Sequence, residues 1–191
     1  AVARAKNEIV EAIKLVVTAF KNGGRLIYVG AGTSGRLGVV DASECPPTFL
    51  SDPEMVQGII AGGREAMFRS IEAAEDSPEN GARAMDERKV GPRDVVFGIA
   101  TGGTTPFVHG AITRARQLGA KTVFCACVPQ KQCGDDADVS IRVLVGPEER
   151  LDPICLEMAA SPLGTPPDLP GPALLGFIAC GALVRTEAFL A

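Results

Sequence analysis

The feature that most constrains this chain is a short apolar run that leads into a glycine-rich loop and then into a helical pattern, over residues 24–38. Leu26–Val29 have the continuous apolar character of a buried parallel strand. Gly30, Gly32 and Gly35 follow, and glycine allows the positive φ and close backbone approach that a sharp turn needs. A strand, a tight loop and a helix in this order predict an α/β fold built on a parallel sheet.

This loop is a candidate anion site. Backbone N–H groups at a helix N-terminus have no partner within the helix, and the helix dipole favours negative charge in front of them. Gly32 lets a ligand approach the backbone, and the hydroxyl groups of Thr33 and Ser34 add donors without bulk or charge, which suits a sugar phosphate. We therefore expect these three residues to bind a phosphate group, with a plain tight turn as the alternative.

The same glycines satisfy the dinucleotide-binding pattern G-x-G-x-x-G, so a nicotinamide or flavin site has to be weighed. That pattern requires an acidic residue about 20 positions further on, at the end of the second strand. The second expected strand, residues 55–60, instead runs into Ala61-Gly62-Gly63-Arg64. The dinucleotide interpretation is therefore the weaker one.

The strand and loop pattern occurs a second time. Residues 95–100 are another continuous apolar run, which ends in small and hydroxyl residues before a helix expected over 106–118. Because ligands of parallel α/β sheets bind at the carboxyl ends of the strands, we expect both loops to face one crevice, with the amides of the second helix serving the same anion. The candidate phosphate-binding residues of the second loop are Thr101, Gly102, Gly103, Thr104 and Thr105.

The remaining elements complete an α/β pattern with a roughly five-stranded parallel sheet flanked by helices, a three-layer sandwich. Pro46-Pro47 are expected to stop the second helix, because the residue before a proline avoids the α region, and this leaves Glu44 at a helix end. Glu75 is expected in the joint between two helices. The further elements are helices over 2–22, 35–43 and 65–73, a helix that follows the N-cap Ser77, and strands over 121–127 and 139–145.

The composition of the chain limits the kinds of partner that it can bind. A chain of 191 residues with 46% hydrophobic content can form one domain with a full core. The net charge of −4, with no basic run and no aromatic cluster, argues against binding to nucleic acid or to an anionic membrane. Nothing resembles a signal peptide, and the apolar runs are too short or too interrupted to span a bilayer, so a soluble, cytoplasmic protein is expected.

The cysteines and the single histidine offer weaker candidates. Six unevenly spaced cysteines, mostly within apolar runs, predict reduced thiols rather than a disulfide scaffold. Cys125 and Cys127 share a face of an expected strand, with Cys133 nearby, but no histidine or second cysteine pair supports a metal cluster. We expect no bound metal. His109 follows the second loop, where a surface or core role is favoured over catalysis.

The C-terminal part differs in kind from the rest. Six of the fourteen prolines lie within residues 153–172, so the single domain expected over 1–191 should carry a proline-rich loop at about 149–172. A mostly apolar helix is expected at about 173–190. Because its apolar surface needs cover and the site rests on one open sheet, we expect a homodimer.

Residues 30–38, GAGTSGRLG, and 41–49, DASECPPTF, closely resemble the N-acetylmuramic acid 6-phosphate etherase family. That family has the sugar isomerase (SIS) domain fold and includes the noncatalytic glucokinase regulatory protein. The resemblance covers roughly residues 5–148. Further matches, in order and spacing, are 60–63, 74–76, 98–100, 115–120 and 145–148.

The resemblance implies cleavage of the lactyl ether of N-acetylmuramic acid 6-phosphate to N-acetylglucosamine 6-phosphate and D-lactate, without cofactor or metal. It assigns Glu44 as general acid and Glu75 as general base, since these positions match the family's catalytic carboxyls. The residues alone leave open that Glu44 is a surface carboxylate at a helix end and Glu75 an ordinary junction residue. Asp41 and Asp76 are expected to be solvated or structural.

Three departures from the family pattern bear on this expectation. Residues 102–107 read GGTTPF where the family usually has SGRTPY, so a serine hydroxyl and an arginine are missing, and Thr101 and Thr104 could compensate. Val128 replaces a usual asparagine, and the family's stretch after Glu148 is replaced by the proline-rich segment. A noncatalytic sugar-phosphate-binding regulator and a sugar-phosphate isomerase therefore stay as alternative functions.

Overall fold

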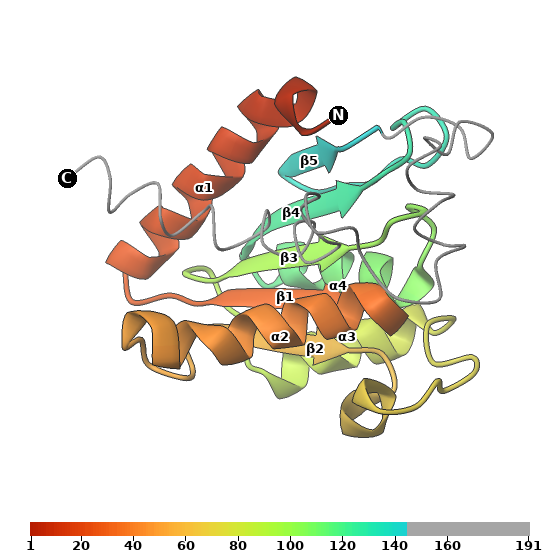
Figure 1. The fold of residues 1–191 in the computed structure, drawn as a ribbon, viewed down its shortest axis with the longest axis horizontal. Coiled ribbons are helices and arrows are strands. Elements are labelled where there is room, and N and C mark those ends of the chain that lie inside the picture. The colour runs from red at the N-terminus through yellow and green to blue at the C-terminus, as the bar shows by residue number, and fades with distance from the viewer. Residues whose placement is uncertain (145–191) are drawn as a thin grey trace, which may run out of the picture. The chain divides into compact units, whose positions relative to one another are not determined.

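Five parallel strands form one sheet in the order β2-β1-β3-β4-β5 (Figure 1). The computed structural model describes residues 1–144, so the expected proline-rich loop and terminal helix at 149–172 and 173–190 lie outside the described residues. The chain leaves β1 for β2 on one side and returns to β3 on the other, which makes the carboxyl ends of β1 and β3 the topological switch point. The strands are β1 Leu26–Gly30, β2 Val56–Ile60, β3 Val95–Ile99, β4 Lys121–Ala126 and β5 Val139–Arg142.

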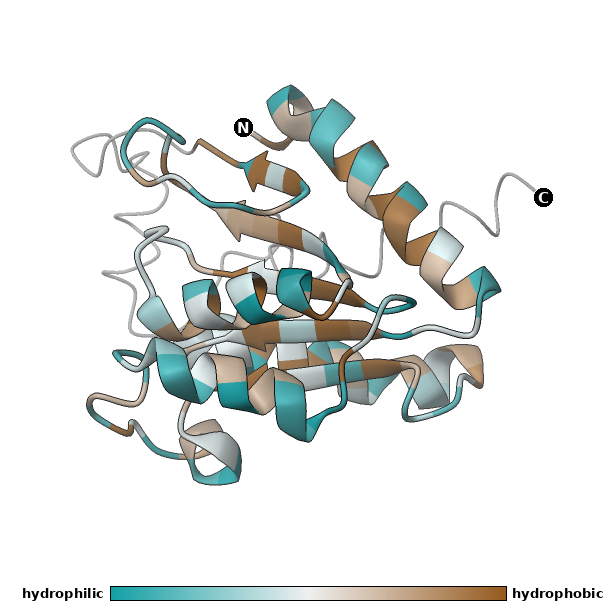
Figure 2. Cartoon of the chain, turned by 180° about the vertical axis from the view of Figure 1, so that it is seen from behind, coloured by the Kyte–Doolittle hydropathy of each residue, from teal (hydrophilic) through white to brown (hydrophobic). Residues whose placement is uncertain are grey.

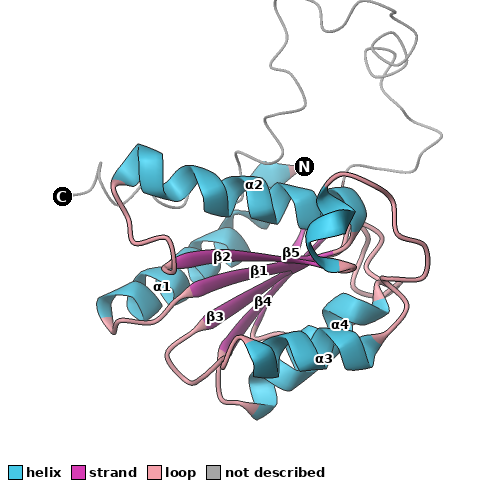
Figure 3. Ribbon diagram, turned by 90° about the horizontal axis from the view of Figure 1, so that it is seen from below, coloured by secondary structure: helices cyan, strands magenta, loops and turns pink. Residues whose placement is uncertain are grey.

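Helices cover both faces of this sheet, which confirms the α/β architecture. In Figure 3, α2 lies on one side of the strands and α3 and α4 lie on the other. Figure 2 shows hydrophobic residues concentrated in the strands, whereas α3 and α4 are largely hydrophilic on the side that faces the viewer. The helices are α1 Lys6–Lys21, α2 Gly32–Phe49, α3 Pro78–Glu87 and α4 Pro106–Gln117, with short 3₁₀ helices at Val2–Ala5 and Gly63–Met67 (η2). None of the described helices combines the length and apolarity needed to cross a bilayer.

Two glycines bring α3 and α4 into backbone contact. A Cβ atom added at Gly81 would lie 1.9 Å from the carbonyl oxygen of Phe107, and one added at Gly110 would lie 2.0 Å from that of Pro78. Only glycine permits so close an approach. The start of α3 and the start of α4 are therefore held against each other, as expected for elements that share the core between this helix pair and the sheet.

The expected stop of the second helix at Pro46-Pro47 is wrong. Helix α2 continues through both prolines to Phe49 and ends at Leu50, which has a φ of 53° and donates its N–H to the carbonyl of Pro46. The prolines remove helical hydrogen bonds only near the end of the helix, and Cys45 just before them is buried, so packing outweighs the local preference. Glu44 consequently lies inside the helix rather than at its end.

The helix expected over 65–73 is also wrong. The chain forms only the short helix η2 and then a series of turns before Ser77, which caps α3 by accepting a hydrogen bond from the N–H of Asn80 at 3.1 Å. Ala66 is buried, but Phe68 is 82% exposed and Ile71 is 41% exposed, so the larger apolar side chains after Met67 have little surface to pack against. Most helical stability comes from such packing, which explains why the helix does not form.

Candidate functional site

The two glycine-rich loops lie next to each other, as the sequence predicts. They leave β1 and β3, which are neighbours in the sheet with Gly30 opposite Ile99. The hydroxyl oxygens of Ser34 and Thr101 are 3.4 Å apart, within reach of a single hydrogen bond. One phosphate group could therefore contact both loops. That it does so stays a prediction.

The first loop presents unpaired donors. Gly32, Thr33 and Ser34 are the first three residues of α2, and Ala31 precedes them as an N-cap whose side chain makes no capping hydrogen bond. The N–H groups at these helix positions have no intrahelical acceptor, whereas Gly35 already donates to the carbonyl of Ala31 at 3.2 Å. Since Gly32 and Thr33 are exposed, the start of α2 is the part of the site best suited to an anion.

A sharp turn places these donors at the carboxyl end of β1. A Cβ atom added at Gly30 would lie 2.6 Å from the backbone nitrogen of Gly35, and one added at Gly35 would lie 2.8 Å from the carbonyl oxygen of Gly30. The G-x-G-x-x-G pattern therefore serves the close strand-to-helix contact. The expected role of glycine in this turn is confirmed.

The second loop offers fewer open amides than expected. Helix α4 begins with Pro106, which has no N–H, and the N–H of Phe107 donates to the backbone carbonyl of Glu75 at 2.9 Å. The next two amides, of Val108 and His109, donate to the carbonyl of Thr105. The expectation that the amides of this helix serve the same anion is therefore wrong, because backbone acceptors already satisfy these donors. Exposed Thr101, Gly102 and Thr104 remain available to a ligand.

His109 and Cys133 hold the second loop in shape, a role that the sequence analysis missed. The carbonyl of Gly103 lies 2.6 Å from Nε2 of His109 and also accepts a hydrogen bond from the thiol of Cys133. The imidazole ring lies 5.1 Å from the ring of Phe124. Cys133 is far away in the sequence and follows β4, so no local pattern could have indicated this contact.

Glu75 is placed beside the second loop. Its backbone carbonyl accepts the Phe107 N–H described above, and the glycine contacts between α3 and α4 keep the segment before α3 against the start of α4. The Glu75 residue itself is exposed. That its carboxylate reaches a sugar bound at the two loops stays a prediction.

Within one chain, Glu44 lies at the opposite end of the sheet from Glu75. Gly35 contacts the end of β1 at Gly30, and Gly38 contacts Tyr28 in the middle of that strand, so α2 runs back toward the amino ends of the strands. Glu44 follows Gly32 by 12 residues, about 18 Å along a helix with a rise of 1.5 Å per residue. A single chain thus does not bring Glu44 and Glu75 together on one substrate.

Asp41 is half-buried rather than fully solvated. Its Oδ2 atom is buried and has no hydrogen-bond partner among residues 1–144. Burial raises the pKa of this carboxyl to about 6. Cys45, one turn further along α2, is buried too, and burial together with the charge of Asp41 raises the pKa of its thiol to about 11.

Cys125 and Cys127 are partly buried. Burial raises the pKa of both thiols, that of Cys125 to about 11. Among residues 1–144, no group of three or more His, Cys, Asp or Glu side chains is arranged to hold a metal ion. The four cysteines within the described residues, Cys45, Cys125, Cys127 and Cys133, carry free thiols.

Comparison with known proteins agrees with the sequence resemblance. A family model described as the glucokinase regulatory protein N-terminal SIS domain matches residues 8–116. N-acetylmuramic acid 6-phosphate etherases from Synechococcus elongatus, Nostoc punctiforme and Crocosphaera subtropica are 62%, 60% and 58% identical over 148 residues. The alignments cover 78% of this chain and 48% of each relative, so the chain spans about half the length of the curated relatives it matches.

Two solved structures show the same fold. Phosphoheptose isomerase GmhA from Neisseria gonorrhoeae has a TM-score of 0.55 at 18% identity, and a phosphoheptose isomerase from Francisella tularensis has a TM-score of 0.54 at 20% identity. Each comparison covers 78% of this chain and 83% of the other. At such identities the likeness establishes the fold alone, and it confirms the α/β architecture.

Proposed function

Because this chain belongs to the SIS-domain family of N-acetylmuramic acid 6-phosphate etherases and glucokinase regulatory protein, we propose that it binds a sugar 6-phosphate at the start of α2 and cleaves N-acetylmuramic acid 6-phosphate. The products are N-acetylglucosamine 6-phosphate and D-lactate, formed in the cytoplasm. The observation that carries the proposal is the set of unpaired N–H groups and hydroxyls at Gly32, Thr33 and Ser34, with the hydroxyl oxygen of Ser34 3.4 Å from that of Thr101 in the second loop.

The proposed reaction is an elimination followed by addition of water. In the open-chain aldehyde, the carbonyl group acidifies the proton on the neighbouring carbon, which bears the acetamido group. Glu75 takes this proton as general base, the C–O bond to lactate breaks, and Glu44 protonates the departing oxygen as general acid. Water then adds to the unsaturated aldehyde, and no redox cofactor takes part because no step is a net oxidation.

The position of Glu44 favours a homodimer in which each site combines two chains. Glu44 lies too far along α2 to reach the crevice of its own chain, but it is exposed, on one helical stripe with Leu37 and Val40. Leu37 is 37% exposed and Val40 is 51% exposed, so this stripe offers an apolar surface for a second copy. In the proposed dimer, Glu75 of one chain and Glu44 of the other act on the same sugar.

A binding protein without catalysis is the second candidate, and the second loop is the observation that favours it. The loop lacks the serine and arginine usual in the family, and the first amides of α4 are already bonded within the protein. Such a protein would bind the sugar phosphate at the start of α2 and release no lactate.

Mixing two inactive variants tests both the activity and the shared site. Parent protein, Glu44→Gln and Glu75→Gln are each incubated with N-acetylmuramic acid 6-phosphate, and free D-lactate is measured. Parent should release lactate, and each variant alone should release it at least about 100-fold more slowly. After unfolding and refolding together in equal amounts, half of the dimers are mixed, and one of the two sites in each mixed dimer has both glutamates, so about a quarter of the parent activity should return.

The controls separate the outcomes. Asp76→Asn, which changes the exposed carboxylate next to Glu75, should keep its activity alone and in mixtures. Mixtures that stay inactive while the parent is active would show that the two carboxyls do not combine across chains. A parent that binds the sugar phosphate but releases no lactate would favour the regulator.

A further inference from the structure

The outer edge of β2 is an unpaired row of backbone groups within the described residues. Strand β2 is the last strand on its side of the sheet. It pairs with β1 in parallel, with the N–H of Ala61 donating to the carbonyl of Gly30 at 2.9 Å, so alternate residues of β2 face β1. The N–H and C=O groups of the other residues point away from the sheet. These outward-facing residues are Val56, Gly58 and Ile60.

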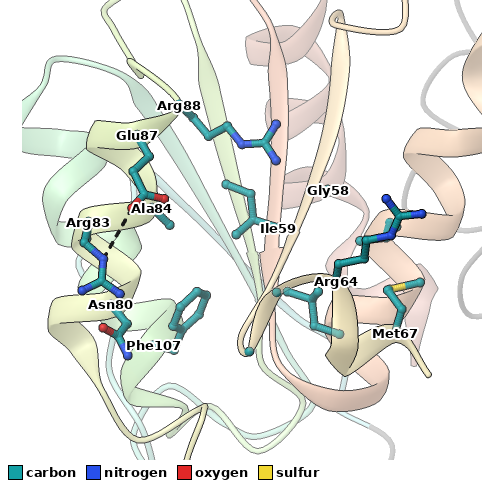
Figure 4. A pocket seen from close by; sticks show the side chains of 14 residues that line it. Gly58, Ile59, Arg64, Met67, Asn80, Arg83, Ala84, Glu87, Arg88 and Phe107 are labelled. Carbon is teal, nitrogen blue, oxygen red and sulfur yellow. Dashed lines mark ion pairs between the residues drawn. The ribbon is translucent and has the colours of Figure 1, made fainter. Parts of the chain in front are cut away.

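A cavity of about 520 Å³ lies along this edge (Figure 4). It includes none of the residues of the two glycine-rich loops. Gly58 and Ile60 of the edge strand line it, together with apolar side chains from both sides of the sheet. These side chains are Val39 of α2, Met67 of η2, Ala84 of α3 and Phe107 of α4.

Two positive charges flank the strand without an acidic partner among residues 1–144. Figure 4 shows Arg88, the residue just after α3, on one side of β2 and Arg64 of η2 on the other. Arg88 donates to the neutral amide oxygen of Gln57 at 2.8 Å. Arg64 makes no hydrogen bond or ion pair with residues 1–144. The third arginine of the cavity, Arg83, is different because it pairs with Glu87 at 3.5 Å.

We propose that this groove binds an extended acidic segment of another polypeptide, which adds to the sheet as a strand beside β2. The backbone of the segment pairs with the outward groups of Gly58 and Ile60. Successive side chains of a strand point to opposite faces, so one acidic side chain reaches Arg64 and another, an odd number of positions away, reaches Arg88. Apolar side chains between them contact the walls of the cavity.

The charges favour such a segment over a second copy of this chain. Strand β2 itself reads Val-Gln-Gly-Ile-Ile and has no acidic side chain to place beside either arginine. Pairing two β2 strands would satisfy the backbone groups but leave both guanidinium groups without a counter-charge. An acidic strand pairs with the backbone groups of β2 and also supplies a counter-charge to both arginines. This inference does not depend on the proposed catalytic function.

A labelled peptide tests the proposal by fluorescence anisotropy with the full chain. The probe reads Thr-Val-Asp-Val-Ile-Glu-Val-Thr, with its two acidic residues on opposite faces of an extended strand. It should bind, and a matched peptide with Asn and Gln in place of the acidic residues should bind at least tenfold more weakly, since charge-assisted hydrogen bonds are lost. A peptide with N-methyl groups on alternate residues should not bind, because it cannot pair along the edge.

Variants of the protein locate the contact. Arg64→Gln and Arg88→Gln should each weaken binding about tenfold. Arg93→Gln, which changes an exposed arginine outside the cavity, should leave binding unchanged. The backbone amide signals of Gly58 and Ile60 should shift in NMR spectra of the parent when the peptide is added. Equal binding of the neutral or N-methylated peptide, or the absence of binding by the acidic probe, would overturn the proposal without bearing on lactate release.

Discussion

The first and second glycine-rich loops are similar in sequence, yet they differ in what they offer a ligand. Both follow a buried strand, contain small and hydroxyl residues and lead into a helix. At the start of α2 the N–H groups of three residues have no acceptor within the helix. The start of α4 has no comparable row of open amides. Its first residue is a proline, and the next three N–H groups donate to the carbonyls of Glu75 and Thr105.

The difference shows that a repeated sequence motif need not present the same donors to a ligand. The start of α2 has open N–H groups suited to an anion, whereas at the start of α4 the N–H of Phe107 is bonded to the carbonyl of Glu75. Segments distant in sequence cause the difference, since the Phe107 N–H bonds to Glu75 and the Gly103 carbonyl contacts His109 and Cys133. Four changes would break or sharpen this comparison.

The largest effect is expected from Glu75→Gln. The change keeps the backbone carbonyl that accepts the Phe107 N–H, so the second loop keeps its shape, but it removes the proposed base. Lactate release should fall about 100- to 10,000-fold, and deuterium from heavy water should no longer enter the carbon next to the aldehyde. The melting temperature serves as the control and should stay unchanged. Full lactate release by this variant would make the carboxylate structural.

Gly110→Ala should disturb the second loop and leave the first loop unchanged. The new methyl group would lie 2.0 Å from the carbonyl oxygen of Pro78 and would push α3 away from α4. The free energy of unfolding, measured by urea denaturation, should fall by about 3 kcal/mol. Gly91→Ala is the matched control, because an added Cβ there meets nothing within 4 Å, and it should change stability by no more than about 0.5 kcal/mol.

Removing hydroxyl groups compares the loops directly. The double change Thr33→Ala and Ser34→Ala should weaken binding of a sugar 6-phosphate about 10- to 100-fold, because hydrogen bonds to a charged group are lost. Thr101→Ala with Thr104→Ala should weaken it less, since the second loop presents fewer donors. Isothermal titration calorimetry gives both affinities. Equal losses in the two double variants would contradict the division of roles, and no loss in the first would place the phosphate elsewhere.

The smallest effect is expected from Asp41, which lies further along α2, the helix that follows the first loop. Burial raises its pKa from 3.8 to about 6, so ionisation costs folding free energy. At about pH 3 and below the carboxyl is mostly protonated in both states and costs little, whereas above about pH 7 it is charged in both states and the cost is complete. Asp41→Asn should therefore be more stable than the parent by about 1–2 kcal/mol at about pH 8, a value reduced by partial solvent screening, with little difference at about pH 3. A stability difference that does not change with pH would contradict the raised pKa.

Local patterns predicted much of the fold. Continuous apolar runs marked the central strands because parallel strands are buried on both faces, and Ser77 marked the start of α3 because a side-chain oxygen must accept an N–H there. The same reasoning failed where packing decided the outcome. Helix α2 continues through Pro46-Pro47, and the expected helix over 65–73 does not form because Phe68 and Ile71 have little surface to pack against.

The sequence by itself determined the parallel sheet, the sharp turn after β1 and the adjacency of the two loops, since these follow from short-range sterics and strand burial. Only the tertiary structure decided which amides remain open, that His109 and Cys133 hold Gly103, and that Glu44 and Glu75 lie at opposite ends of one chain's sheet. Hydrogen-bond satisfaction and the direction of a helix over a sheet depend on residues far apart in the chain. No local pattern of side chains encodes such contacts, which is why the motif predicted a phosphate site without predicting how each loop would contribute to it.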